Sequence, residues 1–499
     1  QQATAGNPAE ASFEWARQWY PVAVMRDLEA RDPRLPYPVQ LLGEALVVWK
    51  DRNGGWKAFA DRCPHRWAPL SEGRVDQTTG RLQCIYHGWE FEGNGECGSI
   101  PQADPAVRDN AQSSKRACAT VIPSKVVQGK LWLWPDTSPE GVEASERVSP
   151  VVVPDMDSDD FGGNWYARDL EYGFDTLLEN LADPAHVPFA HHGVIGSRAM
   201  GSPMGIVMDE DHAVSDGLKT KKTGFNGNNY LVVGFEAPGL IYYKWDYTGV
   251  LPQMLSRLRQ PIKGLSVIMR RFQLDKRMDV KEEDIKDPSE RPLNYFVGYA
   301  VPTTPGKSRI FTRTARNFFL QHPVIPRRWR NSLAKEHLAQ HLVLDGDSMA
   351  LHERSLAAAG EQGVKRPENT FFMPTDADLP IRAFRKWYNS KGGGGPSWAK
   401  GVDPSDLGPI LPLEKVIDRM DAHTKDCSAC SKAYRVSGKV KRVSSGAALL
   451  LVAAAAVCPR GLAALGLAGG ALTSVGIAVA MAKREKKFVY VEYVHATRD

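Results

Sequence analysis

Two short clusters of cysteine and histidine carry the most specific chemistry in this sequence. Cys63 and His65 form the first cluster, and Cys84 and His87 form the second, with eighteen residues between His65 and Cys84. Two irons bridged by sulfide need two protein ligands each, and histidine on one iron raises the reduction potential of the cluster. The spacing therefore predicts a [2Fe-2S] centre. A structural zinc site is the alternative, although zinc ligands are usually paired as Cys-x2-Cys or His-x3-His.

A second pair of histidines indicates a mononuclear iron site. Two histidines and one carboxylate on one face of Fe(II) leave coordination positions open for O2 and a substrate. His186 and His191 offer such a pair, but five residues of a regular helix would turn their side chains about 140° apart. We expect Pro188 to bend the chain so that both imidazoles converge.

The carboxylate ligand must come from a different part of the chain. Asp345 and Asp347 lie within residues 327–354, whose length and apolar spacing predict a long helix. Either acid is a candidate ligand on this evidence. A carboxylate that caps the helix or faces solvent is the alternative for both.

A third group, Cys427 and Cys430, follows His423 in a polar stretch. The Cys-x2-Cys arrangement lowers the pKa of a thiol and favours a reversible disulfide. It therefore indicates redox control by a thioredoxin-like partner. Half of a zinc site, or two thiols without a role, are the alternatives.

Length and composition limit the number of domains and the class of protein to which these residues can belong. A chain of 499 residues is too long for one hydrophobic core, so two or three domains are expected. The net charge of +5 is small and the basic residues form no cluster, so no nucleic acid partner is expected. Seven grouped cysteines do not suit a secreted disulfide scaffold and indicate a reducing compartment.

The expected fold class is α+β. Residues 13–150 contain short strand and turn signals around the first two clusters and predict a small β-rich domain. Residues 160–420 predict a helix-grip domain, in which one antiparallel sheet wraps around the long helix. Residues 1–12 are expected to be disordered. In the second domain, strands are expected at 164–170, 230–235, 241–247, 265–272, 294–301 and 309–315, a helix from near Phe174, and a charged loop at 275–291.

Two uncharged runs near the C-terminus predict a transmembrane hairpin at 443–482. Residues 461–482 would span about 33 Å as a helix, which matches a bilayer core. Basic residues flank the two runs at 439–442 and 483–487, which suits a hairpin with both ends on one side of a membrane. A buried pair of Ala- and Gly-rich helices is the alternative. Residues 421–442 are expected to form a linker, and residues 483–499 a tail.

The residues around the two clusters add a resemblance. Cys63-Pro64-His65-Arg66 and Cys84-Ile85-Tyr86-His87-Gly88-Trp89 resemble the Rieske domain of ring-hydroxylating non-haem iron oxygenases. The spacing Asn180-x2-Asp183-x2-His186-x4-His191 resembles the catalytic signature of the same enzymes.

This resemblance implies roles for several residues. Asp347, rather than Asp345, would be the third ligand of the mononuclear iron, and Asn180 would be a further catalytic residue. The subunits would form a homotrimer. In it, Asp183 would bridge an iron-bound histidine to a Rieske histidine of the neighbouring subunit, with His87 as the expected partner.

Further motifs along nearly the whole chain resemble the plant and algal pheophorbide a oxygenase group. They are Trp19-Tyr20-Pro21-Val22, Leu70-Ser71-Glu72-Gly73-Arg74, Asp169-Leu170-Glu171-Tyr172-Gly173, Ala190-His191-His192, the Cys427 and Cys430 pair, and Tyr493-Val494-His495. The resemblance implies an enzyme of a chloroplast membrane, either inner envelope or thylakoid, whose catalytic domains face the stroma. Reduced ferredoxin would supply electrons, and O2 would open the macrocycle of pheophorbide a to give red chlorophyll catabolite.

Other substrates and one other class of function are alternatives. Related members of the group act on chlorophyllide, protochlorophyllide or a phyllobilin. Tyr242, Tyr243 and Trp245 are candidates to stack on a tetrapyrrole, although aromatic residues at strand spacing are more often core. A redox-sensing subunit of a plastid membrane complex is the alternative to an enzyme.

Overall fold

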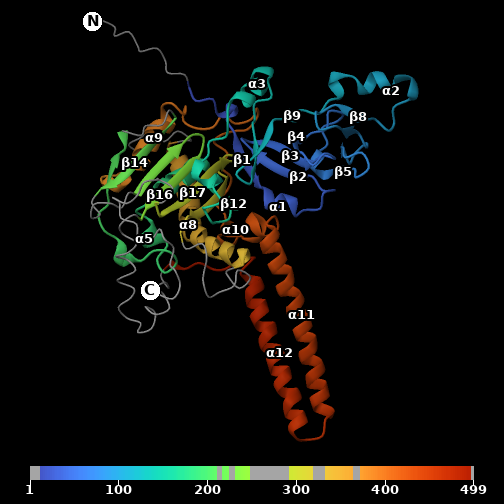
Figure 1. The fold of residues 1–499 in the computed structure, drawn as a ribbon, viewed down its shortest axis with the longest axis vertical. Coiled ribbons are helices and arrows are strands. Elements are labelled where there is room, and N and C mark those ends of the chain that lie inside the picture. The colour runs from blue at the N-terminus through green and yellow to red at the C-terminus, as the bar shows by residue number, and fades with distance from the viewer. Residues whose placement is uncertain are drawn as a thin grey trace.

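The computed structural model describes residues 12–210, 216–223, 231–247, 291–318, 332–362 and 371–495. Figure 1 shows a β-rich N-terminal domain, a larger domain built on an antiparallel sheet, and a helical hairpin that projects from the body. This arrangement confirms the predicted α+β fold class. The predicted disorder of residues 1–12 lies outside the described residues, except for Ser12.

Small antiparallel sheets make up the N-terminal domain. Helices α1 (Met25–Glu29), α2 (Pro105–Gln112) and α3 (Pro139–Arg147) accompany them. In sheet order, the strands are β1 (Tyr20–Val24), β11 (Lys130–Leu133) and β10 (Ser124–Val127); then β2 (Tyr37–Leu41), β3 (Glu44–Lys50), β4 (Trp56–Ala60) and β9 (Val121–Ile122); then β5 (Arg74–Val75), β6 (Leu82–Gln83), β7 (Glu90–Phe91) and β8 (Cys97–Ser99).

A tight turn and a buried core hold the β3–β4 hairpin in place against Cys63 and Cys84. The carboxylate of Asp51 accepts hydrogen bonds from the backbone N–H groups of Asn53 and Gly55, at 2.9 and 2.8 Å, and these bonds close the turn. Trp49 and Phe59 of this hairpin pack in one buried cluster that also contains Cys63 and Cys84. The sulfur ligands are thus anchored in a hydrophobic core.

The larger domain is organised around an antiparallel sheet. Among the described residues its strand order is β12-β18-β17-β16-β15-β14-β13. Because side chains alternate along each strand, one face of the sheet packs against the N-terminal domain and the other against helices. The strands are β12 (Tyr166–Leu170), β13 (Gly205–Met208), β14 (Gly217–Thr223), β15 (Leu231–Glu236), β16 (Leu240–Asp246), β17 (Leu293–Pro302) and β18 (Ser308–Arg316).

Helices α4, α8 and α9 cover the second face of the sheet. Leu177 of α4, Leu344 and Leu351 of α8 and Phe384 of α9 share one buried cluster with Ile241 of the sheet. This packing sets the end of α4 against the middle of α8, as a sheet around a long helix requires. The helices of this domain are α4 (Phe174–Ala182), α5 (Val187–Ala190), α8 (Leu333–Gln362), α9 (Leu379–Asn389) and α10 (Leu413–Val416).

The predicted elements of this domain match the structure unevenly. The strands expected at 164–170, 241–247, 294–301 and 309–315 agree with β12, β16, β17 and β18 to within two residues. The strand expected at 265–272 and nearly all of the charged loop at 275–291 lie outside the described residues. β13 and β14 have no counterpart in the prediction.

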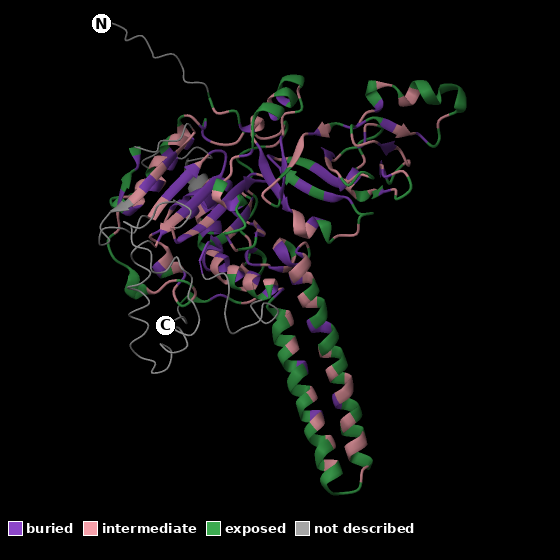
Figure 2. Cartoon of the chain, viewed as in Figure 1, coloured by how far each residue is buried: buried purple, intermediate pink, exposed green. Residues whose placement is uncertain are grey.

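The C-terminal hairpin consists of α11 (Ser428–Val457) and α12 (Leu462–Lys486). The two helices run side by side away from the body, and most of their surface is exposed (Figure 2). By length and composition both could cross a membrane. Leu450 and Leu472 are 73% and 74% exposed, so the alternative of a buried helix pair is wrong.

The predicted linker at 421–442 is helical in the structure. It contains most of the π-helical turn Met420–Thr424, called η12 below, and the first half of α11. Lys441 of α11 pairs with Glu485 of α12 at the body end of the hairpin. Because this segment is helical and α11 also contacts α8, the hairpin is joined to the larger domain without a flexible linker.

Candidate functional site

The Cys63 and Cys84 clusters lie on two loops of matching conformation. In each loop the residue four positions after the cysteine, Trp67 or Gly88, donates its backbone N–H to the cysteine carbonyl, at 2.8 and 3.0 Å. Both residues adopt a positive φ, 60° and 70°. A left-handed conformation costs roughly 1–2 kcal/mol for a residue other than glycine, so the fold imposes this turn on Trp67. The two loops therefore share one backbone turn, although the histidine follows the cysteine by two residues in the first loop and by three in the second.

Burial separates the two kinds of ligand. Cys63 and Cys84 are buried, whereas His65 is exposed and His87 is half-buried. The ring centroids of the two histidines lie 4.5 Å apart, and His65 stacks on Trp89 at 4.7 Å. A cluster held here would have its thiolate-bound iron inside and its histidine-bound iron at the surface, where electrons can leave.

The four donors do not converge on one point as zinc ligands would. Among the described residues, the groups whose donor atoms all lie within 4.8 Å of one another do not include these four side chains. A two-iron cluster needs such a spread, because each iron takes only one pair of ligands. The hydrogen bond from Cys63 lowers the pKa of Cys84 to about 6, which favours a thiolate at neutral pH.

His186 and His191 lie at the two ends of the short helix α5. Helix α4 ends at Ala182, and Asp183 leaves it with φ −95° and ψ 105°. His186 is then the N-cap of α5, and His191 is its C-cap. Pro188 lies in the first turn of α5, where proline is tolerated. The predicted proline bend is therefore wrong. The break at Asp183 lets a new single-turn helix begin at His186, and His191 leaves that turn with φ −106° and ψ 23°, so the two histidines lie at the ends of one turn and not along a regular helix.

Asp347 completes a three-donor group with these histidines. The Nε2 atoms of His186 and His191 are 3.2 Å apart, and Asp347 Oδ2 is 3.3 Å from His191 Nε2 and 3.9 Å from His186 Nε2. The side chains of His191 and Asp347 are 3% and 6% exposed, while that of His186 is 22% exposed. Two imidazoles and one carboxylate in this arrangement fit Fe(II) and leave coordination positions free.

The carboxylate of Asp345 is bound by two arginine side chains and does not belong to the three-donor group. Arg168 donates to its Oδ1 at 2.6 Å, and Arg419 donates to its Oδ2 at 2.6 and 2.9 Å. All three side chains are buried. Because two guanidinium groups already satisfy this carboxylate, Asp347 is the acid of the pair that remains available to a metal.

The environment tunes the pKa of each donor. Burial raises the pKa of Asp347 to about 6 and lowers the pKa of His191 to about 4. Burial also opposes a charge on His186, but the nearby carboxylates of Asp183 and Asp347 outweigh it and raise the pKa of His186. At neutral pH the buried His191 is therefore neutral and Asp347 is ionised, which are the forms that bind a metal.

Asn180 and Asp183 contact the donor group from the α4 side. Asn180 donates a hydrogen bond to Asp347. Asp183 Oδ2 lies 3.6 Å from Nδ1 of His186, the ring nitrogen on the far side from the other donors. A carboxylate at this position fixes the orientation and tautomer of a metal-binding imidazole.

Within one chain, Asp183 and the Rieske-type loops are far apart in the fold. Figure 1 places the sheet β5–β8, which flanks those loops, and helix α5 at opposite sides of the body. Ring contacts of His87 are with His65 and Tyr86 of its own domain. The expected bridge between Asp183 and His87 would therefore need a second subunit.

A cavity of about 350 Å³ opens beside the three donors. Its polar wall contains Asn180, Asp183, His186 and Asp347. The rest of the wall includes the apolar side chains of Leu351, Phe371, Met373 and Ile381, together with Glu179, Arg354, Asp378 and His495. The cavity thus combines metal donors with a lining that is partly apolar and partly charged, and substrate sites commonly combine apolar and polar groups.

The C-terminal segment closes part of this site, which the sequence analysis did not predict. Tyr493 Oη donates to the carbonyl of Ala190 at 3.1 Å, and His495 lines the cavity. A Cβ atom on Gly346 would lie 2.8 Å from Tyr493 Oη, so glycine allows this close approach next to Asp347. The available signal was the closing motif Tyr493-Val494-His495.

The predicted substrate-stacking residues do not share one site. Tyr243 and Trp245 stack at 5.6 Å, and Tyr243 Oη donates to the carbonyl of Leu181 at 2.7 Å. Tyr242 faces the other side of the sheet, where it lines a separate cavity of about 610 Å³. The reason is the alternation of side chains along β16. None of the three is among the described residues that line the cavity beside Asp347.

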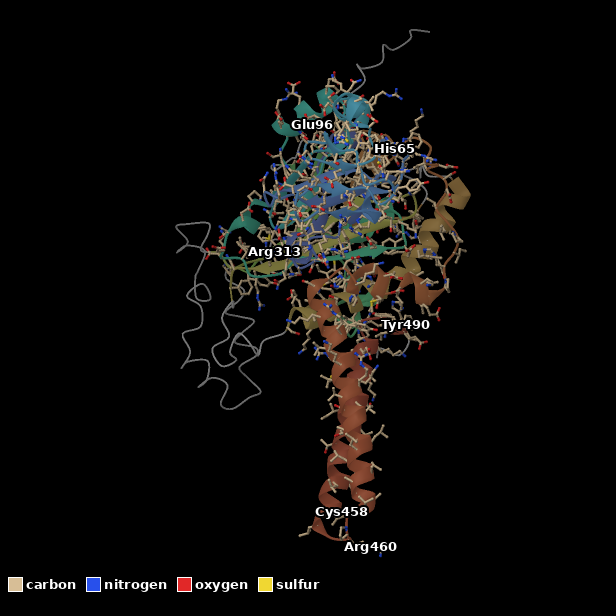
Figure 3. All side chains as sticks on the ribbon, turned by 90° about the vertical axis from the view of Figure 1, so that its right-hand side faces the viewer. His65, Glu96, Arg313, Cys458, Arg460 and Tyr490 are labelled. Carbon is tan, nitrogen blue, oxygen red and sulfur yellow. The ribbon has the colours of Figure 1, made fainter. Side chains whose placement is uncertain are left out.

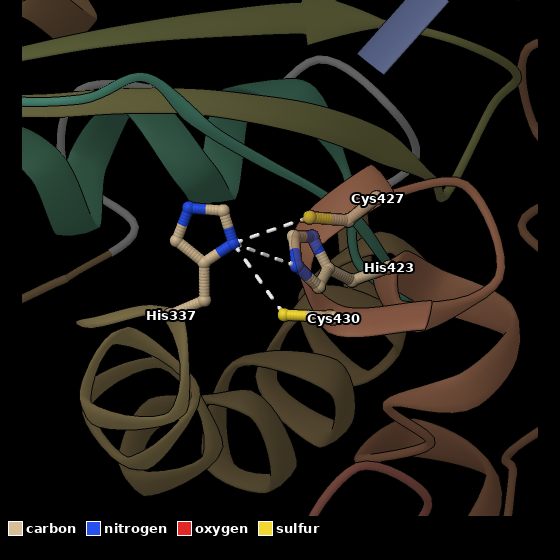
Figure 4. A group of neighbouring side chains, drawn as sticks. All are labelled: His337, His423, Cys427 and Cys430. Carbon is tan, nitrogen blue, oxygen red and sulfur yellow. Dashed lines mark hydrogen bonds between the residues drawn. The ribbon is translucent and has the colours of Figure 1, made fainter. Parts of the chain in front are cut away.

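Cys427 and Cys430 lie in a buried group with His337 and His423 (Figure 4). The sequence analysis noted that His423 precedes these cysteines but did not connect His337 with them. His337 is on α8, far away in the sequence, so only the tertiary fold brings it to the group.

Comparison with known proteins places this geometry in a family. Residues 18–120 match the family described as Rieske [2Fe-2S] domain, and residues 273–363 match the family described as pheophorbide a oxygenase. The chloroplastic pheophorbide a oxygenases of Oryza sativa subsp. japonica and Arabidopsis thaliana are each 35% identical to the chain. They cover 98% and 97% of it, and it covers 87% and 85% of them.

Other relatives carry other names. The chloroplastic flavonoid 8-hydroxylase 2 of Ocimum basilicum is 34% identical over 90% of this chain and 79% of its own length. Among solved structures, dicamba monooxygenase bound to dicamba superimposes with a TM-score of 0.53 at 18% identity, over 77% of this chain and 98% of that one. This structural likeness supports the fold.

Proposed function

The chain belongs to the pheophorbide a oxygenase family of Rieske non-haem iron oxygenases, and from this premise we propose that it oxygenates a chlorophyll-derived tetrapyrrole. The preferred substrate is pheophorbide a, whose macrocycle would open to give red chlorophyll catabolite. The observation that carries the proposal is the convergence of His186, His191 and Asp347 beside a cavity in a chain that also has a Rieske domain. A redox sensor would need no such second centre.

Each side chain of the site has a defined task. His186, His191 and Asp347 would bind Fe(II), which supplies positions for O2 beside the substrate, while the cluster supplies single electrons. Asp183 orients His186 through Nδ1, and Asn180 orients Asp347. Leu351, Phe371 and Met373 form the apolar part of the cavity wall, which an apolar substrate would contact. In each turnover one oxygen atom of O2 would enter the substrate and the other would leave as water, with two electrons and two protons consumed. Opening the oxygenated bond to two carbonyl groups would take its second oxygen atom from water by hydrolysis.

Electron delivery supports a homotrimer. The Rieske loops and α5 lie at opposite sides of one chain (Figure 1), so a short path needs the loops of a neighbour. The exposed rim of those loops, with Trp67, Ile85 and Tyr86 more than half exposed, is apolar enough to pack against another subunit. There Asp183 would connect His186 to His87 of the partner subunit. Reduced ferredoxin is the proposed electron donor.

The hairpin supports attachment to a membrane. Figure 3 shows Cys458 and Arg460 at its free tip and Tyr490 near the body. The basic residues of α11 and α12, from 439–442 and 483–487, lie at the body end of both helices. If the hairpin enters a membrane, its charged flanks and the catalytic domains share one side. We propose the stromal side of a chloroplast membrane, since the relatives named above are chloroplastic.

Flavonoid hydroxylation is a second candidate. The Ocimum relative is about as similar to this chain as the pheophorbide a oxygenases are. Hydroxylation of a ring carbon would use the same iron donors and the same balance of O2, electrons and protons. The two candidates differ only in what the substrate cavity accepts.

Turnover of a substrate panel tests the proposal. Purified full-length protein in detergent, with reduced ferredoxin and O2, is given pheophorbide a, chlorophyllide a, protochlorophyllide, a phyllobilin or a flavone. Mass spectrometry follows the loss of substrate and the gain of oxygen. Consumption of pheophorbide a at the highest rate supports the proposal, while consumption of the flavone alone favours the second candidate. A protein that consumes no tetrapyrrole contradicts the primary proposal.

A further inference from the structure

A buried group of histidine and cysteine side chains lies apart from both iron centres. It consists of His337 on α8, His423 in η12, Cys427 at the N-cap of α11, and Cys430 in the first turn of α11 (Figure 4). All four side chains are buried, and their donor atoms all lie within 4.8 Å of one another. No role in the oxygenase reaction requires these residues.

The contacts within this group cannot all be satisfied as hydrogen bonds. Nδ1 of His337 lies 3.1 Å from Nε2 of His423, 3.3 Å from Sγ of Cys427 and 3.6 Å from Sγ of Cys430. Neutral His337 has a single ring hydrogen, and the two thiols can donate as well. If Nε2 carries that hydrogen, bare Nδ1 of His337 faces the lone pair on Nε2 of His423, because Nδ1 of His423 donates to the carbonyl of Ala167. If Nδ1 carries that hydrogen, Nε2 of His337 is an acceptor that is buried without a hydrogen-bond partner. A cation among the four donors would satisfy all of them through their lone pairs.

The spacing and the support of these donors suit a small tetrahedral ion. Bonds of about 2.0–2.1 Å to nitrogen and 2.3 Å to sulfur put tetrahedral donors roughly 3.3–3.8 Å apart, close to the separations above. Nδ1 of His423 also contacts the carbonyl of Ala167 on β12 at 2.5 Å. That contact fixes the ring and turns Nε2 toward the group, as a partner of a metal-binding histidine does.

We propose that His337, His423, Cys427 and Cys430 form a structural zinc site. Two thiolates and two imidazoles make a donor set that zinc prefers, and four protein donors leave no open position for a substrate. The iron triad differs, because it has no sulfur and borders a cavity. His337 and His423 supply the second pair of zinc donors, which the Cys-x2-Cys motif alone does not provide.

The site would fasten the hairpin to the catalytic domain. Cys427 and Cys430 begin α11, whereas His337 lies on α8, the helix that also carries Asp347. Around the group, Ala334 of α8 and Phe488, which follows α12, complete one buried cluster. Zinc would therefore join the root of the membrane hairpin to the helix that supplies an iron ligand.

Metal analysis of the purified full-length protein tests the proposal. Protein produced with zinc and iron present is expected to contain one zinc per chain in addition to its iron. Cys430→Ser should lose the zinc and keep its iron and the Rieske spectrum. Cys458→Ser, at the free tip of the hairpin, removes a thiol outside the group and should keep the zinc. Growth with cobalt should give thiolate charge-transfer bands in the wild type, which Cys430→Ser abolishes.

Two results would overturn the zinc site. One is wild-type protein without zinc in which Cys427 and Cys430 form a disulfide that thioredoxin reduces, which is the redox interpretation of this pair. The other is zinc that stays bound in Cys430→Ser and in His423→Gln alike. Wild-type zinc content and the cobalt spectrum do not depend on how well a variant folds, so they decide the question even if a variant aggregates.

Discussion

Asp345 and Asp347 lie two residues apart on α8, yet their carboxylates serve different structures. Asp345 is fully enclosed between the guanidinium groups of Arg168 and Arg419, whereas Asp347 Oδ2 lies 3.3 Å from Nε2 of His191. Two residues along a helix turn the side chain by roughly 200°. One acid therefore stabilises the fold, and its neighbour is left for iron.

Replacing each acid by its amide should separate these two roles. Asp347→Asn is expected to lower the iron content from about three to about two per chain and to abolish oxygenation, with the Rieske spectrum unchanged. Asp345→Asn leaves two buried cations with a neutral partner and should destabilise the protein by about 3–5 kcal/mol. Metal analysis and thermal unfolding measure the two effects. Loss of iron in Asp345→Asn, but not in Asp347→Asn, would reverse the assignment.

The Rieske ligands can be tested through the reduction potential. His65→Cys replaces a neutral imidazole by a thiolate, and the added negative charge should lower the potential by hundreds of millivolts, toward about −400 mV. Redox titration followed by electron paramagnetic resonance measures the change. Cys118→Ser is the control, since Cys118 lies outside the two loops and should leave the potential unaltered. An unchanged potential in His65→Cys would rule out His65 as a ligand.

Iron binding should depend on pH through the buried donors. Asp347, with its pKa raised to about 6, must lose a proton before it binds iron. Raising the pH toward 6 should therefore increase the affinity for iron by up to about tenfold per pH unit through Asp347. The increase should continue above pH 6, because His186, whose pKa is raised, must also lose its proton. Equilibrium iron binding to the metal-free protein at several pH values gives this curve. Affinity that is independent of pH between 5 and 7 would contradict the role of Asp347.

The stability of the metal-free protein should change much less over the same range. Asp347 holds its proton more tightly when folded, so its contribution to stability falls as pH rises from about 4 to 6. His191, with its pKa lowered to about 4, binds a proton more readily when unfolded, so its contribution rises as pH increases from 4 toward its ordinary value of 6.5. The two contributions oppose each other. Thermal unfolding of metal-free Asp347→Asn should therefore show a stronger rise with pH than the wild type.

The hairpin predicts a physical attachment to lipid. Full-length protein should float with anionic vesicles and resist alkaline extraction. Arginine at Leu472 and Val475, near the middle of α12, should release it, because each arginine at the centre of a span costs about 2.5–3.5 kcal/mol. Val436→Arg, near the body end of α11, is the matched control and should stay bound. Vesicle flotation gives the bound fraction, and wild-type protein that remains free of vesicles would contradict membrane insertion.

Sequence reasoning worked best where the chemistry is local. The Cys63 and Cys84 loops are short, so their ligand spacing was readable without tertiary information. Sequence reasoning failed where the interaction partner of a residue lies far away along the chain. Arg168 is 177 residues from Asp345, and Arg419 is 74 residues away, so no local pattern could show which acid was already neutralised.

Two errors have specific physical causes. The bend between His186 and His191 was assigned to Pro188 because proline disrupts a helix interior, but the break at Asp183 makes Pro188 part of a new first turn. Tyr242 and Tyr243 were grouped as substrate residues, although adjacent residues on one strand face opposite sides. His337 remained outside every prediction because only the packing of α8 against α11 brings it to Cys427.

A single-turnover experiment tests the central claim most directly. Protein with a chemically reduced cluster and bound Fe(II), but no ferredoxin, is mixed with pheophorbide a and labelled 18O2, so that the cluster can supply one of the two electrons and the ferrous ion the other. The account predicts that the cluster is reoxidised and that the product contains one 18O atom, whereas Asp347→Asn keeps its cluster reduced and its substrate intact. Equal product from Asp347→Asn, or reoxidation of the wild-type cluster with the tetrapyrrole unchanged, would contradict it.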